Sequence, residues 1–113
     1  MYTRGDILID KEQESDVVVV QLSSRRVDEV VVKPKNIAEN RYEDHTVYDY
    51  NARYGYVQPD EPVVKAVYIE SLPTDPTELT REGRAILARN ADAKTYAFPI
   101  SRLAPTDDSQ NSS

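Results

Sequence analysis

The stretch DVVVVQL, residues 16–22, decides the fold, because four valines follow one another in it, at positions 17–20. β-Branched side chains lose χ1 freedom in a helix and pack well on a pleated sheet, so the run predicts a β-strand. A half-buried strand alternates apolar and polar residues, whereas an unbroken apolar run is typical of a strand covered on both faces. We therefore expect an inner strand of a barrel, or of a sheet with a helix packed on it.

Two further strands are predicted in the first third of the chain. Residues 6–10 predict a strand, and the polar residues 11–15 after it predict a hairpin turn. Residues 23–26 predict a second turn. Residues 27–33 predict a third strand, which ends at Pro34 because proline has no backbone N–H for a sheet ladder. Short polar links between the three strands predict an antiparallel meander.

The rest of the chain predicts shorter elements around one long strand. In order, we expect a helical turn over residues 36–40, a short strand over 46–50, turns over 54–56 and 58–60, a strand over 62–72 and a strand over 95–100. Pro99 places the last strand at an edge of the sheet, again because it lacks an N–H donor.

One helix is predicted between residues 75 and 90. Asp75, followed by Pro76, and Thr80 are alternative N-caps for it, and Asn90 is a reasonable end. Helical spacing places four residues on a single apolar face: Leu79, Gly83, Ile86 and Leu87.

Together these elements predict an α+β fold that is mainly β: a small bent antiparallel sheet or SH3-like barrel with one helix in the C-terminal half. A chain of 113 residues has the usual length of one domain. We expect residues 1–103 to form that domain. Residues 104–113 are small and polar and predict a disordered tail.

Composition narrows the classes of function. Twenty acidic and fourteen basic residues give a net charge of −6, which opposes general binding to nucleic acid or to an anionic membrane. Cysteine is absent, so disulfides, thiolate nucleophiles and cysteine-held metals are excluded. Three glycines form no phosphate-binding loop, so we expect no cofactor. No segment approaches the ~20 apolar residues of a membrane span, which predicts a cytoplasmic protein without a membrane partner.

A segment rich in tyrosine and arginine, residues 41–56, stands out from this background. Its candidate binding residues are Arg41, Tyr48, Tyr50, Arg53, Tyr54 and Tyr56. Rings beside cations anchor protein interfaces and also stack on the bases of single-stranded nucleic acid, whereas the simplest interpretation is ordinary packing. Acidic neighbours such as Asp49 and Glu61 disfavour nucleic acid. The first functional hypothesis is therefore a non-enzymatic protein-interaction or regulatory module that can also self-associate, and the alternative is single-stranded RNA binding.

A third hypothesis is a hydrolase or nuclease centred on His45, the one side chain whose ordinary pKa is close to neutral pH. A single histidine without an evident nucleophile is more often a surface residue, so no catalytic residue is predicted. No calcium-loop spacing occurs either, and hard cations need several convergent oxygens, so no metal site is predicted.

Parts of the chain resemble known proteins. The start YTRGDIL, residues 2–8, resembles the first strand of SH3-like barrels, including the PemK-type toxin nucleases, whose basic and hydroxyl catalytic positions have no match here. The pieces YTRGDILID, DVVVV, TVYDYNARY, EPVVKAVYIESL and TYAFPISRLAP are similar to a group of short uncharacterised haloarchaeal proteins. That resemblance implies a cytoplasm rich in potassium chloride, in which a dense acidic surface is well screened. It implies no activity, and His45 with its neighbours departs from the pattern.

Overall fold

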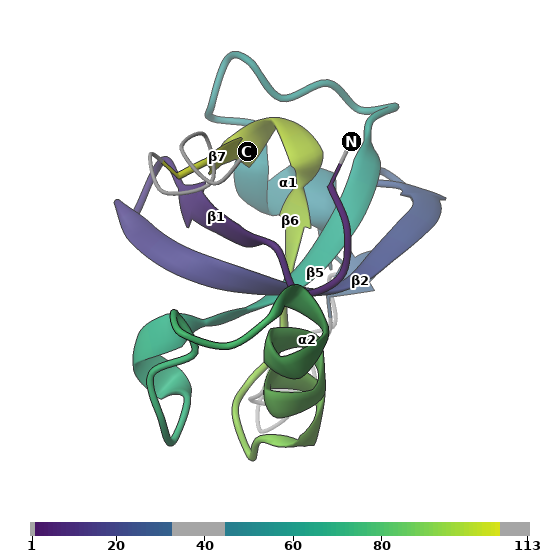
Figure 1. Ribbon diagram of the computed structural model, residues 1–113. Coiled ribbons are helices and arrows are strands. Elements are labelled where there is room, and N and C mark those ends of the chain that lie inside the picture. Colours follow the sequence, from purple (N-terminus) through teal and green to yellow (C-terminus); the bar gives the residue numbers. More distant parts are fainter. Residues whose placement is uncertain (1, 33–44, 107–113) are drawn as a thin grey trace, which may run out of the picture.

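The structure is a computed structural model that describes residues 2–32 and 45–106. Its elements, with η for 3-10 helices, are β1 (Ile7–Asp10), β2 (Ser15–Arg26), β3 (Val31–Val32), β4 (His45–Thr46), α1 (Val47–Asn51), β5 (Pro62–Tyr68), η1 (Ile69–Ser71), α2 (Arg81–Asn90), β6 (Tyr96–Pro99), η2 (Ile100–Arg102) and β7 (Leu103–Pro105). Figure 1 shows α1 and α2 on opposite sides of the main sheet.

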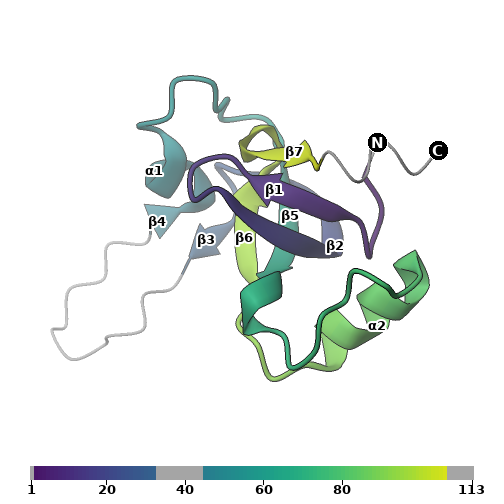
Figure 2. The same cartoon turned by 60° about the vertical axis from the view of Figure 1, so that its left-hand side comes forward.

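Five strands form an antiparallel sheet in the order β6-β5-β2-β1-β7, and β3 pairs with β4 apart from it (Figure 2). The valine run lies in β2, the central strand, and Val17, Val18 and Val19 are fully buried. The predicted mainly-β α+β class, with an inner strand covered on both faces, is confirmed.

The sheet is strongly bent, because its two edge strands are consecutive in the chain. In a flat five-stranded sheet the edge strands would lie about 19 Å apart, at ~4.8 Å per neighbouring pair. The link from β6 to β7 is only the three-residue helix η2, and a 3-10 helix rises about 2 Å per residue. The edges must therefore approach each other. They do not pair in the described part of the chain, so the sheet is not a closed barrel.

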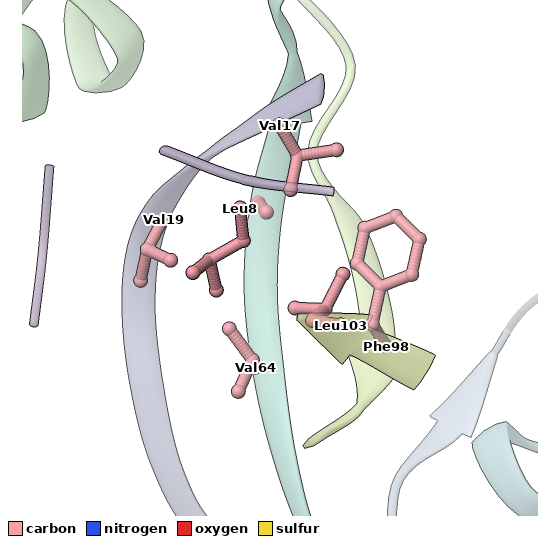
Figure 3. Close-up of a cluster of buried hydrophobic side chains, with 7 residues drawn as sticks. Leu8, Val17, Val19, Val64, Phe98 and Leu103 are labelled. Carbon is pink, nitrogen blue, oxygen red and sulfur yellow. The ribbon is translucent and has the colours of Figure 1, made fainter. Parts of the chain in front are cut away.

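The inside of the bend holds the main core, drawn in Figure 3. Its buried members are Leu8, Val17, Val19, Val64, Ala66, Phe98 and Leu103. Val18 is paired with Val67 and alternates to the opposite face of the sheet, on which α2 packs against β2. The valine run is buried on both faces because the core covers one face and α2 the other.

The first hairpin of the predicted meander is confirmed, because β1 pairs antiparallel with β2 across the turn at residues 11–14, but the third strand of the meander is wrong. β2 continues through residues 23–26, which were expected to turn, because register shifts after Val19 and after Leu22 keep its polar end paired with β5. Of residues 27–33, only β3 is a strand among those described, and it pairs with β4. β5 lies beside β2 instead, and its β-branched residues are buried like those of β2.

The strand predicted over residues 46–50 is wrong beyond Thr46, the last residue of β4, because α1 begins at Val47. The Asp49 backbone N–H donates to Thr46 Oγ1 at 3.2 Å, and the Thr46 N–H donates to Asp49 Oδ2 at 2.8 Å. This reciprocal pair is a capping box, which starts a helix despite the strand preference of Val47 and Tyr48. The helical turn predicted over residues 36–40 lies outside the described residues.

Of the two candidate N-caps, Thr80 begins α2. The Gly83 N–H donates to Thr80 Oγ1 at 3.0 Å. Asp75 instead accepts the N–H of Thr77 at 3.0 Å, in a local turn before the helix. The predicted helix is thus confirmed with the later of its two starts.

The predicted apolar face of α2 is only partly correct. Leu79 and Ile86 are 41% and 46% exposed, whereas Ala88 is buried. Arg84 Nε donates to the Gly5 carbonyl at 2.7 Å and ties the helix to the segment before β1. α2 therefore contacts the rest of the protein through a small residue, Ala88, and a hydrogen-bonding residue, Arg84. A small contact residue allows the helix to lie close to the sheet.

The C-terminal elements follow the sequence prediction more closely. β5 covers the first part of the strand predicted over residues 62–72, and β6 is an edge strand, as Pro99 indicated. Both turns predicted between α1 and β5 are present. β7 includes Ala104 and Pro105, which were placed in the tail, and residues 107–113 lie outside the described residues. None of the described helices has the length and apolar character needed to cross a membrane.

Candidate aromatic and cationic groove

An open groove of about 870 Å³ lies between β6 on one side and β3 with α1 on the other. Residues of β5, η1, η2 and the β1–β2 hairpin also line it. α1 packs against β6, and Val32 and Ala97 share one buried cluster, so the two walls belong to one packed unit. We call this hollow the β6–α1 groove.

Five aromatic rings line the groove: Tyr50, Tyr54, Tyr68, Tyr96 and Phe98. Tyr50 and Tyr96 offer the most surface, at 47% and 37% exposed. Tyr68 is partly buried and meets Tyr96 and Phe98 edge-on, with ring centroids 5.2 and 5.9 Å apart. The inner rings therefore support Tyr96, whereas Tyr50 meets the ring of His45.

The charged residues that line the groove are mostly cations: Arg53, Lys65, Lys94 and Arg102, with Glu70 as the carboxylate among the described residues. This contrasts with the net charge of −6 on the whole chain. A cleft lined by one sign of charge concentrates ligands of the opposite sign. The groove is a cationic region on an acidic protein.

A buried ion pair lies at the base of the groove. Arg102 donates from Nε to Asp10 Oδ1 at 2.7 Å and from Nη2 to Oδ2 at 2.9 Å, and Asp10 has no exposed surface. The Tyr68 hydroxyl donates to the same Oδ2 at 2.7 Å, and Arg102 Nη1 donates to Asn51 Oδ1 at 2.9 Å. This network joins β1, β5, α1 and η2.

Burial raises the pKa of Asp10, but the hydrogen bonds from Arg102 and Tyr68 and the arginine charge outweigh it, so the pKa lies below its ordinary value. Burial, followed by the bond to Asp10, raises the pKa of Tyr68. The carboxylate is therefore ionised and the phenol protonated at neutral pH. The charge of Arg102 is compensated, and its guanidinium lies 5.5 and 5.3 Å from the ring centroids of Tyr54 and Phe98.

The cations left uncompensated in the groove are Arg53, Lys65 and Lys94, which form no ion pair with any described carboxylate. Arg53 donates from Nη2 to the Tyr54 hydroxyl at 2.9 Å. These charges come from the turn after α1, from β5 and from the residues before β6, so they lie along the groove rather than at one point.

Three of the six candidate binding residues predicted from sequence line the groove: Tyr50, Arg53 and Tyr54. Tyr48 packs instead against the buried cluster around Val27 and Val47. Tyr56 stacks on Tyr54 with centroids 6.1 Å apart, and its hydroxyl donates to a carboxylate of the β1–β2 turn. Arg41 lies outside the described residues.

Sequence reasoning missed the groove residues of the other elements: Lys65, Tyr68, Lys94, Tyr96 and Arg102. One of these pairs carried a local signal. Lys94 directly precedes the strand predicted over residues 95–100, and Tyr96 lies within it. A cation close to a tyrosine in the chain also occurs at Arg53 and Tyr54.

His45 is not among the residues that line the groove. Its Nδ1 lies 3.9 Å from Asp49 Oδ2, and its ring meets Tyr50 edge-on at 5.6 Å. Within residues 2–32 and 45–106, no group of three or more His, Cys, Asp or Glu side chains could hold a metal.

Comparisons of the chain with family models, with curated proteins and with solved structures gave no match. The function is therefore argued from the groove itself. Its two distinguishing features are exposed flat rings and uncompensated positive charge.

Proposed function

We propose that the β6–α1 groove binds single-stranded RNA. Sites for single strands combine a cationic groove, which follows the phosphate backbone, with aromatic side chains on which bases stack. Tyr50 and Tyr96 supply exposed rings, and Arg53, Lys65 and Lys94 supply charge. The observation that carries the proposal is this concentration of cations beside exposed rings on a protein of net charge −6.

Two of the acidic residues that argued against nucleic acid, Asp49 and Glu61, are engaged outside the groove. Asp49 is engaged in the cap of α1. Glu61 accepts the N–H and hydroxyl of Ser101 at 2.8 and 2.7 Å. Neither carboxylate lines the groove, nor does their acidic neighbour Asp60. Two further acidic neighbours, Glu43 and Asp44, lie outside the described part of the chain. The ranking of the two leading hypotheses is therefore reversed.

Tyr50→Ala should weaken binding of a 12-nucleotide oligouridylate by about 1–3 kcal/mol, the value of one stacked base. Lys65→Gln should lower the slope of log affinity against log salt by about 0.7, because one phosphate contact is lost. Fluorescence anisotropy over a series of KCl concentrations measures both effects.

Ile86→Ala and Arg89→Gln are matched controls, because both residues are exposed on α2 and neither lines the groove. A duplex of the same length should bind more weakly, since its bases are already stacked. Equal effects of the groove and control variants, or no binding of the oligonucleotide by the wild type, would contradict the proposal.

A second candidate function is the protein-interaction module, for which the two edges of the sheet provide support. β6 and β7 are edge strands, and an unpaired edge is a template for a strand from another chain. If an edge strand of one copy pairs with an edge strand of another, the protein should self-associate. Sedimentation at low and at molar KCl should show dimers, and a strict monomer under both conditions would rule out this version.

We also infer that the bent sheet is an SH3-like barrel left open between β6 and β7, in a protein of a salt-rich cytoplasm. The short link between the two edge strands supports the open barrel. The acidic composition, which keeps a protein solvated at high salt, supports the salt-rich cytoplasm. In such a cytoplasm the stacking of bases would contribute more to RNA binding than the screened charges.

A further inference from the structure

Among the described residues, three tyrosine rings each have a nearby cation over the ring. The pairs, with the distance from the cationic atom to the ring centroid, are Lys11 Nζ on Tyr56 at 4.3 Å, Lys94 Nζ on Tyr96 at 4.7 Å and Arg53 Cζ on Tyr54 at 5.0 Å. Of these, the second combines an exposed ring with a position in the β6–α1 groove. It is therefore the pair that a ligand in the groove could reach and rearrange.

The ring of Tyr96 is packed against other rings, whereas the Lys94 ammonium that covers it is held by fewer contacts. Tyr68 meets the ring edge-on at 5.2 Å, and Phe98 lies 6.4 Å from it at a tilt. Phe98 is buried in the main core, so this support is anchored in the sheet. Lys94 is a flexible, strongly hydrated side chain that forms no ion pair with a described carboxylate.

A stacked base should displace the lysine from the ring. An exposed cation–π contact favours its own formation about 2- to 5-fold, whereas a base stacked on an aromatic side chain contributes about 5- to 150-fold to binding. The displaced ammonium remains next to the stacked nucleotide, because only Thr95 separates Lys94 from Tyr96 in the chain. A phosphate group is then its natural counter-charge.

We propose that Lys94 and Tyr96 form one nucleotide subsite, in which the base takes the place of the ammonium on the ring and the ammonium pairs with the adjacent phosphate. This inference rests on the proposed RNA binding by the groove. Lys94 covers the ring in the free protein and binds phosphate in the complex, so Tyr96 recognises the base and Lys94 the backbone.

The test compares an oligouridylate with an abasic ribose-phosphate strand of the same length, which offers phosphates without bases. Tyr96→Leu should lower affinity for the oligouridylate about 5- to 150-fold and leave affinity for the abasic strand at the wild-type value. Lys94→Gln should lower the log–log salt slope by about 0.7 for both strands. Tyr96→Phe keeps a flat ring and should bind both strands as the wild type does.

Arg89→Gln removes the same charge from α2, outside the groove, and should leave both salt slopes unchanged. The subsite is overturned if Tyr96→Leu weakens both strands equally or neither, while Tyr50→Ala still weakens the oligouridylate. Should Tyr96→Leu not fold, an unchanged salt slope in Lys94→Gln overturns the subsite. If the wild type binds neither strand, the proposed function itself fails, which is a distinguishable result.

Discussion

Asp10→Asn is expected to lower the free energy of unfolding by about 3–5 kcal/mol, the usual effect of removing one partner of a buried ion pair. Asparagine has the shape of aspartate, so packing changes little. The side chain of Arg102, only 14% exposed, loses its counter-charge and remains in the interior. Urea unfolding at neutral pH, followed by circular dichroism, measures the change.

The double variant Asp10→Leu with Arg102→Met is the control, because it removes both charges together. Apolar residues of similar volume often replace a buried ion pair without loss, so the double variant should recover much of the stability. Recovery stays incomplete, since the Tyr68 hydroxyl and Asn51 each lose a hydrogen-bond partner. An Asp10→Asn protein as stable as the wild type would show that the ion pair is not a structural element.

The same ion pair sets a pH dependence. The pKa of Asp10 is lower in the folded protein than its ordinary value, so the unfolded chain binds the proton more tightly. The stability from ionised Asp10 is complete above the ordinary carboxyl pKa of about 3.9 and is lost as the pH falls through the lower, folded pKa. The gap in stability between the wild type and Asp10→Asn should therefore narrow below about pH 4.

Gly5→Ala is expected to cost more than the ~1–3 kcal/mol of a strained backbone conformation alone. Gly5 has φ +90°, and a Cβ there would lie 2.0 Å from the carbonyl oxygen of Arg81. That oxygen belongs to the backbone of α2, so relief requires a shift of the helix. Thermal unfolding measures the loss of stability, and the circular dichroism of the folded state shows whether α2 is disturbed.

Gly55→Ala is the matched control for this substitution. A Cβ at Gly55 would meet no atom within 4 Å, and its φ is not positive. A surface change of this kind usually stays within about 0.5 kcal/mol. If Gly5→Ala and Gly55→Ala unfold at the same temperature, the close contact between the segment before β1 and α2 does not hold the helix.

The sequence predicted what local side-chain chemistry determines. The four valines of β2 restrict their own backbone to a strand, and an apolar run of this length is typical of a strand covered on both faces, so a central strand followed from residues 17–20 alone; three of the four, Val17 to Val19, are fully buried. Which strand lies beside β2 is a long-range choice, and β5 is separated from it by the β3–β4 pair and α1. The start of α1 was visible as Thr46 with Asp49 three residues later and was missed in favour of strand propensity.

In the groove, too, the sequence reveals residues that are close in the chain but not those that long-range strand pairing brings together. Tyr50, Arg53 and Tyr54 lie within five residues, so a local pattern could reveal them. Lys65 and Lys94 join them only through the pairing of β5 with β6. The ion pair beneath joins residues 92 positions apart, a separation at which no periodicity in the sequence carries information.

The most direct test of the central claim is a titration of the 15N-labelled protein with an oligouridylate in KCl, followed by amide chemical shifts. Binding in the β6–α1 groove predicts that the largest changes fall on α1, Lys65 and the residues from Lys94 to Phe98, while α2 stays unchanged. Changes centred on α2 or β7, or none at an excess of the oligonucleotide, would contradict RNA binding by this groove.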